Sequence, residues 1–400
     1  MSLFLQVVSL EEALRVVREV APPPGEEEVP LAGALGRVLA RDLHARQDIP
    51  GFARTTVDGY AVRAADTTGA GEAIPAILQM AGELTMGSPP GKSIRPGEAM
   101  YIPTGAMLPA GADAAVMIEY TEQIGDEILV KRPVAPGENV ILGDEDFPKG
   151  SLVLPRGRII SPREVGILAA TGFEGVPVYR KPVIGILSTG NELVPVRDTP
   201  GPGQVRDANG PMCAAFVEAV GCVARPYGII RDDRDALGDA LDRAIRECDA
   251  VLISGGSSKD TRDLAASIVA EKGEVLVHGI AIAPGKPTII GRAGGRPVIG
   301  LPGHPASAYV ILHALGRPLL AAMSGSPAGE RRLRAVLAEN IPSQKGRTEF
   351  VRVRVRDGRV FPCFGKSGLL NTFAGSDGLV QVPAGREGFE AGETVEVTLW

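Results

Sequence analysis

The sequence predicts a multidomain α/β plus β protein, in which a doubly wound α/β domain is preceded and followed along the chain by β-rich regions. Residues 181–325 alternate short apolar runs with helical segments, the pattern of a parallel sheet covered by helices. Residues 30–180 and 326–400 instead carry short apolar runs separated by Gly, Pro and Asp turns. The length of 400 residues exceeds one ordinary hydrophobic core, so several domains are expected.

The chain begins with a predicted amphipathic helix. Ser9 and Glu12 have the spacing of a capping box, and the run APPPG at 21–25 ends the helix. Its apolar face carries Leu10, Leu14, Val17 and Val20. The β-rich region that follows contains little expected helix except near 162–170.

The α/β segment is expected to bring four loops to one edge of its sheet. The loops STGNE (188–192), RDD (231–233), SGGSSKD (254–260) and LPGHP (301–305) each follow a predicted strand. Ligands of such sheets bind outside the carboxyl ends of the strands, so these loops should converge on one site. A long helix from Ala306 to about Ser324 closes the segment.

The last segment returns to strands. Its clearest strand alternates valines with arginines, which predicts a half-buried strand with one basic face. The alternating residues are Val351, Val353 and Val355, and Arg352, Arg354 and Arg356.

Composition excludes several classes of function. Aromatic residues make up 4% of the chain and its net charge is −6, which argues against a nucleic-acid partner. The four cysteines show no CxxC pairing, and three of them lie in apolar contexts typical of small buried side chains. We expect no signal peptide, no apolar run of membrane-spanning length and no membrane partner, and hence a cytoplasmic protein.

The segment 249–269 carries the strongest local signal. A buried strand is followed by the turn Ser-Gly-Gly-Ser-Ser and then by a helical pattern. A glycine loop between a strand and a helix presents backbone N–H groups that favour an anion. Asp260 and Asp263 in the same turn would repel that anion unless a divalent cation stood between them. The alternative is a purely structural strand-to-helix turn.

The predicted strand ends are rich in carboxylates. Glu192, Asp232, Asp233, Asp260 and Asp263 have no histidine–cysteine cluster beside them, so they suit Mg²⁺ better than zinc. The alternative for Asp232 and Asp233 is that they only precede a helix whose N-cap is Asp235.

Four segments allow both a binding and a structural interpretation. The segment 301–307 is either a rigid anion cradle or a tight turn, and its His304 has no acid nearby in the sequence to orient it. Asp58 and Thr104 each precede a glycine and fit ordinary turns as well as a site. The acidic run 144–146 likewise fits a solvated loop. No Ser-His-Asp triad can be assembled.

Taken together, the motifs resemble one family over essentially the whole chain. The motifs are VDGYAVR (57–63), PTGAMLPAGADAAVM (103–117), STGNEL (188–193), GIIRDD (228–233), SGGSS followed by Asp263, PGKP (284–287) and GLPGHPAS (300–307). Their order and spacing are similar to those of the molybdopterin molybdenumtransferases, relatives of the gephyrin E domain.

The resemblance implies a domain division and an assembly. An N-terminal helix (1–26) would pack with a molybdopterin-binding α/β domain (181–325). Residues 27–44 and 148–180 would form an elongated linking domain, residues 45–147 a β-rich lid-like domain, and residues 326–400 a β-barrel-like domain. The implied assembly is an elongated homodimer, whose active cleft combines the α/β domain of one subunit with other domains of its partner.

The resemblance also implies the reaction. Molybdate would be inserted into adenylylated molybdopterin with Mg²⁺ as cofactor, and AMP would leave. The dithiolene of the pterin would bind the metal, so that no cysteine ligands are needed. The implied partners are the small-molecule substrates, a molybdopterin adenylyltransferase and molybdoenzyme apoproteins.

Site residues carry over position by position. The catalytic set is Asp58, Thr104, Asp146, Glu192, Asp232 and Asp263, of which Asp232 and Asp263 would hold Mg²⁺ or orient the substrate. The cofactor-binding set is Gly255, Gly256, Ser257, Ser258, Lys286, Pro302, Gly303, Pro305 and Ser367.

Two positions depart from the family pattern. Asp260 stands where a glycine is usual, and Ala283 stands where a basic residue is usual, so both reduce the positive potential for an anion. The charge is either restored from elsewhere, for example by Lys259 or Arg262, or the chain is a divergent paralogue. The alternatives are therefore a non-catalytic carrier of the pterin and a molybdopterin adenylyltransferase. Molybdopterin adenylyltransferases resemble only the central domain of this chain. The motif VDGYAVR and the presence of a C-terminal domain therefore argue against an adenylyltransferase.

Overall fold

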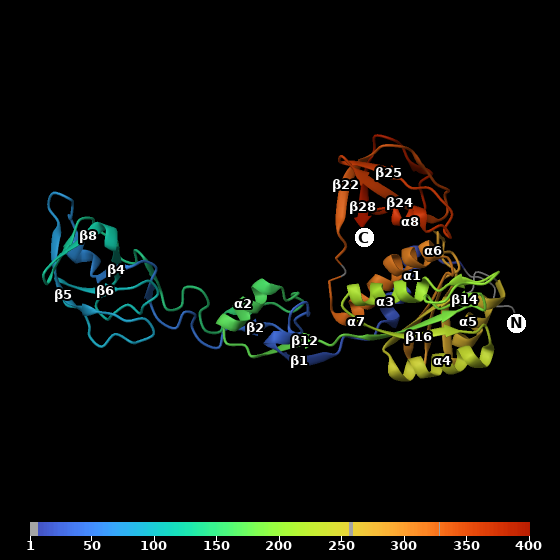
Figure 1. Ribbon diagram of the computed structural model, residues 1–400, viewed down its shortest axis with the longest axis horizontal. Coiled ribbons are helices and arrows are strands. Elements are labelled where there is room, and N and C mark those ends of the chain that lie inside the picture. Colours follow the sequence, from blue (N-terminus) through green and yellow to red (C-terminus); the bar gives the residue numbers. More distant parts are fainter. Residues whose placement is uncertain (1–6, 256–258, 328) are drawn as a thin grey trace. The chain divides into compact units, whose positions relative to one another are not determined.

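The computed structural model describes residues 7–255, 259–327 and 329–400, with the backbone alone at 259–263. The chain divides into two compact units, each described here by itself. One comprises residues 1–29, 36–40 and 177–400, and the other residues 30–35 and 41–176. Figure 1 shows the elements of both units along the chain.

The first unit contains a six-stranded sheet in the order β16-β13-β17-β21-β20-β18. Its strands are β16 (Val223–Ile230), β13 (Val183–Thr189), β17 (Ala250–Gly255), β21 (Arg296–Leu301), β20 (Ile289–Ala293) and β18 (Gly273–His278). The first four run parallel, which confirms the doubly wound prediction for the part of the sheet that carries the loops.

The expectation of a wholly parallel sheet is wrong at one edge. Strand β20 runs antiparallel to both of its neighbours. It turns into β21 through Gly294 and Gly295, whose φ angles of 54° and 77° form the tight turn that a two-residue hairpin needs. The Gly-Gly dipeptide between two apolar runs was the sequence signal for this hairpin.

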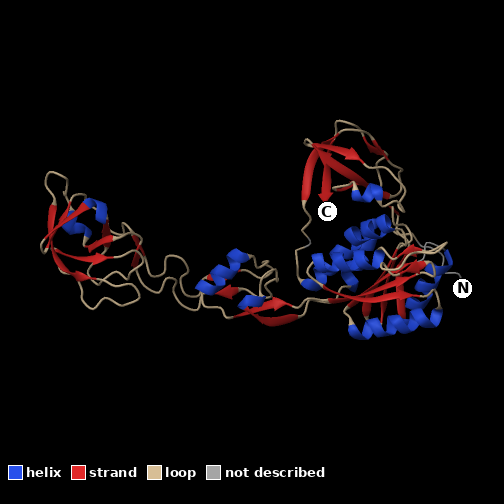
Figure 2. Ribbon diagram, in the orientation of Figure 1, coloured by secondary structure: helices blue, strands red, loops and turns tan. Residues whose placement is uncertain are grey.

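Helices cover both faces of this sheet (Figure 2). On one face lie α1 (Leu10–Val20), α3 (Asn209–Ala219), α6 (Pro305–Ile311) and α7 (Arg317–Ser324), and on the other α4 (Arg234–Glu247) and α5 (Lys259–Lys272). Successive residues of one strand serve both cores, as Ile186 does on the first face and Leu187 on the second.

Two helix starts differ from the predicted caps. Ser9 accepts the N–H of Glu12 at 3.1 Å, but the Glu12 carboxylate pairs with Arg15, so only half of the predicted capping box forms. Helix α4 is capped by Asp233, whose carboxylate accepts the N–H of Ala236 at 2.9 Å, and not by Asp235 as predicted. Asp233 has the extended backbone that a cap requires, whereas Asp235 already lies in the first helical turn.

The last helical segment corrects a second expectation. A π-helical turn, Leu312–Gly316, joins α6 to α7. The whole segment, Pro305–Ser324, is long and apolar enough to cross a membrane, contrary to the expectation from the sequence. Within it, 72% of the apolar 18-residue stretch is buried in the described protein, and this apolar character matches its place in the core beside the sheet.

The C-terminal residues of the first unit close a β-barrel, as the family resemblance implied. Five strands follow one another as β24-β25-β22-β28-β26, and β26 pairs back onto β24. They are β22 (Arg332–Leu337), β24 (Thr348–Arg356), β25 (Arg359–Pro362), β26 (Gly378–Val382) and β28 (Thr394–Leu399). The short strand β19 (Ile282–Ala283), from the α/β segment, pairs in parallel with the start of β24.

The predicted basic face of β24 is only partly exposed. Arg356 is exposed, but Arg352 is 8% exposed because a loop covers it. Its guanidinium donates to the Gly365 carbonyl at 2.7 Å, and Arg354 donates to that of Gly375 at the same distance.

The second unit is built on another six-stranded sheet, in the order β7-β4-β6-β5-β9-β8. Its strands are β4 (Gly59–Val62), β5 (Ala76–Glu83), β6 (Glu98–Ile102), β7 (Ala114–Met117), β8 (Thr121–Ile124) and β9 (Glu127–Val130). The only α-helix described in this unit is α2 (Pro162–Ala170), at the predicted place. The smaller pairs are β2 (Leu43–His44) with β11 (Leu152–Leu154), and β3 (Arg54–Thr55) with β10 (Val140–Ile141).

An aromatic cluster joins the barrel to the last helical segment. The His313 ring lies 4.7 Å from that of Tyr309 and 5.3 Å from that of Trp400, the single tryptophan. Phe373 lies 5.6 Å from Trp400, whose indole N–H donates to the Ser376 carbonyl. Burial lowers the pKa of His313 to about 4, so its ring is neutral at physiological pH.

This burial predicts a pH-dependent stability. Between about pH 6.5 and pH 4, the unfolded chain binds a proton at His313 that the folded chain does not. The free energy of unfolding should therefore fall as the pH falls, by about 1.4 kcal/mol per pH unit from this group. Urea unfolding followed by Trp400 fluorescence should show a smaller loss from about pH 7 to about pH 5 in His313→Phe than in the wild type. The exposed His44, changed to Gln, is the control, and equal losses in all three proteins would contradict the account.

Candidate active site

Three of the four predicted loops are described, and they lie at one edge of the sheet, as predicted. β13 leads into Gly190–Glu192, β16 into Arg231–Asp233, and β21 into Pro302–His304. The loop after β17 includes Gly256, Ser257 and Ser258, which lie outside the described residues, as does the side chain of Asp263.

Asp232 is held by the end of the neighbouring strand. The Thr189 hydroxyl donates to one of its carboxylate oxygens, and the N–H of Asn191 donates to the other at 3.3 Å. In return, the Asn191 side-chain carbonyl accepts the N–H of Asp232 at 3.2 Å. Since Asp233 caps α4, the two acidic residues have separate roles, and Asp232 faces the strand ends rather than the helix.

Close backbone packing requires glycine at the end of β17. A Cβ atom at Gly255 would lie 2.2 Å from the carbonyl oxygen of Thr189. A Cβ atom at Gly190 would lie 2.8 Å from a carboxylate oxygen of Glu192, so this acidic side chain folds back over its own loop. The two glycines thus let the strand ends and a carboxylate come together.

A cavity of about 420 Å³, here called the strand-end cavity, gathers several predicted residues. Glu192, Gly255, Gly303 and Pro305 line it, together with Thr189, the residue that holds Asp232. Asn209 also lines it, and its amide donates to the Gly303 carbonyl at 2.9 Å. This bond ties the start of α3 to the loop after β21.

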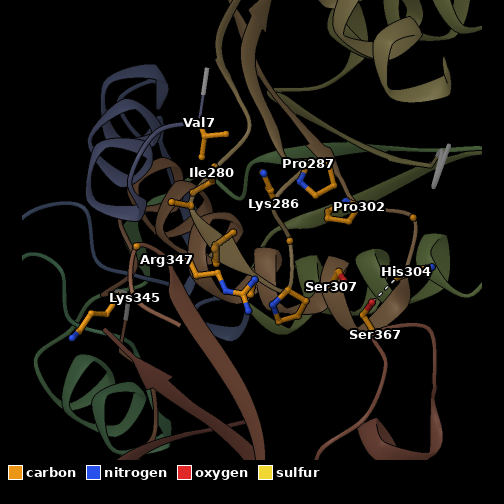
Figure 3. A pocket seen from close by; sticks show the side chains of 17 residues that line it. Val7, Ile280, Lys286, Pro287, Pro302, His304, Ser307, Lys345, Arg347 and Ser367 are labelled. Atoms are coloured by element: carbon orange, nitrogen blue, oxygen red, sulfur yellow. Dashed lines mark hydrogen bonds between the residues drawn. The ribbon is translucent and has the colours of Figure 1, made fainter. Parts of the chain in front are cut away.

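A second cavity, of about 570 Å³, is here called the lysine cavity and is shown in Figure 3. Lys286, Pro302, Gly303 and Ser367 line it, all of them predicted site residues. His304 and Gly303 line both cavities, so the loop after β21 forms their common wall. Loops from the α/β sheet and from the barrel therefore contribute to one site.

The side chain that orients His304 comes from the barrel. Its Nδ1 lies 2.9 Å from the Ser367 hydroxyl, a hydrogen bond drawn in Figure 3. The sequence offered no partner for His304, because the serine lies 63 residues further along the chain. This bond fixes the position of Ser367 at the cavity wall.

Two catalytic candidates of the second unit are bonded to each other. The backbone N–H and the hydroxyl of Thr104 donate to the same Asp58 oxygen at 2.7 and 2.9 Å. These bonds lower the pKa of Asp58. Asp146 is exposed, and its N–H donates to the Ile49 carbonyl at 3.1 Å.

Of the two predicted Mg²⁺ ligands, only the Asp232 side chain belongs to the described residues. No group of three or more His, Cys, Asp or Glu side chains placed to hold a metal ion occurs among them. Mg²⁺ commonly uses one or two carboxylates and completes its shell with water and substrate oxygens, and Asp232 fits that requirement. The buried Cys213 and Cys222 have pKa values raised to about 12 by burial, so both thiols are protonated at neutral pH.

Arginines of the barrel are the main functional candidates that the sequence did not reveal. Arg352 lines a smaller cavity, of about 220 Å³, with Pro284, Cys363 and Ser367. Its Nη1 is buried without a hydrogen-bond partner among the described residues, and burial lowers its pKa. Alternation along β24 placed this arginine on a solvent face, and only the covering loop, 13 residues further along the chain at Gly365, brings it inside.

Comparison with known proteins identifies the family over nearly the whole chain. Three family models match: the MoeA N-terminal region (domains I and II) at residues 8–172, a probable molybdopterin binding domain at 185–322, and the MoeA C-terminal region (domain IV) at 334–400. A molybdopterin molybdenumtransferase of Bacillus subtilis is 33% identical, over 98% of this chain and 94% of its own.

Two archaeal proteins are also similar. A molybdopterin biosynthesis protein of Methanocaldococcus jannaschii is 36% identical over the full length of both chains. A crystal structure of the molybdopterin biosynthesis MoeA protein from Pyrococcus horikoshii superposes with a TM-score of 0.88 at 41% identity, covering 98% of this chain and 99% of its own.

The bond between Thr189 and Asp232 gives a prediction. Thr189→Val keeps the shape of the side chain but leaves one carboxylate oxygen without its donor, which should lower the free energy of unfolding by about 1–2 kcal/mol. Thr189→Ser keeps the hydroxyl and should lose less than half of that. Urea unfolding at neutral pH measures both, and equal losses in the two variants would show that the bond contributes nothing.

Proposed function

Because this chain belongs to the molybdopterin molybdenumtransferases, enzymes of molybdenum cofactor biosynthesis, we propose that it inserts molybdate into adenylylated molybdopterin and releases AMP. The observation that carries this proposal is the pair of adjoining cavities. One is lined by the carboxylates of Glu192 and Asp207 and by Thr189, which holds Asp232, and the other is lined by Lys286 with no carboxylate among its described lining residues. Such a pair suits a magnesium-bound phosphoanhydride beside a free oxyanion.

The residues of this chain would position the substrates and neutralise charge. Asp232, fixed by Thr189 and Asn191, would hold Mg²⁺ together with Asp263, and the ion would neutralise the phosphates of the adenylylated pterin. The Gly255–Gly256 backbone, with Ser257 and Ser258, would bind phosphate, while Glu192 would act from the loop after β13. Lys286 and Ser367 would receive molybdate in the lysine cavity.

The wider setting is also a proposal. We propose a homodimer in which Asp58, Thr104 and Asp146 of one subunit complete the cleft of its partner. A molybdopterin adenylyltransferase would supply the substrate, and molybdoenzyme apoproteins would receive the product. All four cysteines are free thiols, which supports a cytoplasmic setting. The matches to the N- and C-terminal family models favour this reaction over adenylyl transfer.

The direct test is AMP release from adenylylated molybdopterin with Mg²⁺, measured with and without molybdate. We expect release that depends on molybdate and yields a metal-loaded pterin. Tight binding without release would instead support a non-catalytic carrier, and transfer of AMP onto molybdopterin would support an adenylyltransferase.

The role of Asp232 gives a second prediction. Asp232→Asn should weaken the binding of Mg²⁺ in the presence of AMP by about tenfold or more, since a neutral amide replaces a charged ligand. Asp233→Asn is the matched control, because it removes the same charge at the next residue, which caps α4. Calorimetric titration measures both. If Asp232→Asn bound the metal and nucleotide as tightly as the wild type, the assignment would be wrong.

A further inference from the structure

Two buried polar groups at the strand-end cavity have no hydrogen-bond partner. Ser254 is 1% exposed and Asn209 is 8% exposed, and both residues line this cavity. The Ser254 hydroxyl oxygen and the Asn209 side-chain carbonyl oxygen are buried without a partner among the described residues. Because an unsatisfied buried polar group costs free energy, two such groups at one cavity point to a ligand that satisfies them.

The orientation of the Asn209 amide follows from its one hydrogen bond. Its nitrogen donates to the Gly303 carbonyl oxygen at 2.9 Å. The opposite orientation would set two carbonyl oxygens against each other, so the hydrogen-bond network assigns the oxygen as the unpartnered end. This oxygen can only accept a hydrogen bond. The ligand group that satisfies it must therefore be a donor.

Ser254 faces the helix that begins with Asn209. Along β17, Leu252 packs in the core on the face that α3 covers, and the alternation of a strand puts Ser254 on this same face. Ser188, the residue paired with Ser254 in β13, lies directly under the first turn of α3, because a Cβ atom at Gly210 would lie 2.7 Å from its hydroxyl. The two unpartnered groups thus belong to one layer between the sheet and α3.

A carboxylate adds a second acceptor at the same cavity. Asp207 lines it, is itself buried, and accepts the N–H of Gly210 at 2.9 Å through one oxygen. A carboxylate has about four lone-pair positions, so Asp207 can accept further hydrogen bonds from a ligand. The described polar groups of this layer are therefore two acceptors and one hydroxyl, which can also donate.

This pattern distinguishes between the parts of an adenylylated pterin. The pyrimidinone ring of a pterin has an amino group and a ring N–H side by side, both donors, next to an oxo group that accepts. Adenine has one amino donor between ring nitrogens that accept, and the phosphates offer acceptor oxygens. Only the pterin edge matches two acceptors beside a hydroxyl.

We propose that Asn209, Asp207 and Ser254 bind the amino-pyrimidinone edge of the pterin and thereby determine specificity for it. The Asn209 oxygen and the Asp207 carboxylate accept from the amino group and the ring N–H, and the Ser254 hydroxyl donates to the oxo group. The pterin then lies on one side of the wall formed by Gly303 and His304, with the lysine cavity on the other. This inference rests on the proposed function, which makes an adenylylated pterin the substrate.

The test is fluorescence titration of the full-length protein with pterin and with lumazine, which carries an oxo group in place of the amino group. The wild type should bind pterin about tenfold or more tightly than lumazine, because lumazine sets an oxygen against the Asn209 oxygen. Asn209→Ala should weaken pterin binding by about tenfold and remove most of this preference. The affinity for AMP, measured by calorimetry, should stay the same in this variant.

Ser254→Ala separates a contact with the ligand from a structural role. Its hydroxyl has no partner to lose in the protein, so thermal unfolding should occur at the same or a higher temperature, while pterin binding weakens by about three- to tenfold. Ser151→Ala is the matched control, because this hydroxyl is also buried without a partner among the described residues but belongs to the other unit. It should leave pterin binding unchanged.

The outcomes separate this inference from the proposed reaction. Pterin binding as tight in folded Asn209→Ala and Ser254→Ala as in the wild type would overturn it, even if the wild type inserts molybdate. Weaker binding of AMP instead of pterin in both variants would place the adenine in this cavity and would also overturn it, as would a wild type that binds neither ring or both equally. The expected losses would support it even if the wild type releases no AMP, and then only the reaction would be wrong.

Discussion

The parallel pairing of β13 with β16 on one side and with β17 on the other is the constraint on which the site depends. Parallel neighbours end at the same edge, so residues that are far apart in the sequence become adjacent without any long loop. Thr189, at the end of β13, contacts both neighbours. Its hydroxyl holds Asp232 after β16, and its carbonyl oxygen leaves room only for a glycine at 255 in β17.

The barrel contributes residues to the candidate site, although it follows the α/β segment in the sequence. The bond between His304 and Ser367 and the pairing of β19 with β24 both join the barrel to the α/β part. The aromatic contacts of Trp400 with Tyr309 and His313 form a third connection between the same two parts. Through these contacts, Ser367 and the barrel arginines reach cavities whose other walls come from the loops after β19 and β21.

The sequence predicted the features that local patterns determine. The helices and the four parallel strands follow from periodicity and turn residues, and the family resemblance is confirmed by the matches over nearly the whole chain. The alternation of strands with helices does not predict the reversed strand β20, because a two-residue hairpin and not a helix joins it to β21. The site residues themselves stay predictions, and those of the loop after β17 lie outside the described residues.

What the sequence could not predict depends on contacts between distant residues. Arg352 was expected on a solvent face because alternation describes only one strand, and the loop that covers it comes from further along the chain. The partner of His304 was likewise hidden by sequence separation. The N-cap of α4 is Asp233 rather than the predicted Asp235. Asp232, Asp233 and Asp235 are all suitable residue types, and the backbone angles determine which of them caps the helix.

The most direct test of the central claim, that strand-end loops and barrel together form one oxyanion site, is a crystal structure of the protein with tungstate. Tungstate is a tetrahedral oxyanion of nearly the same size and charge as molybdate, and its anomalous scattering locates it without ambiguity. The account predicts a single strong anomalous peak in the lysine cavity, in contact with Lys286 and with groups of the barrel. A peak at a distant surface, with that cavity empty, would contradict it.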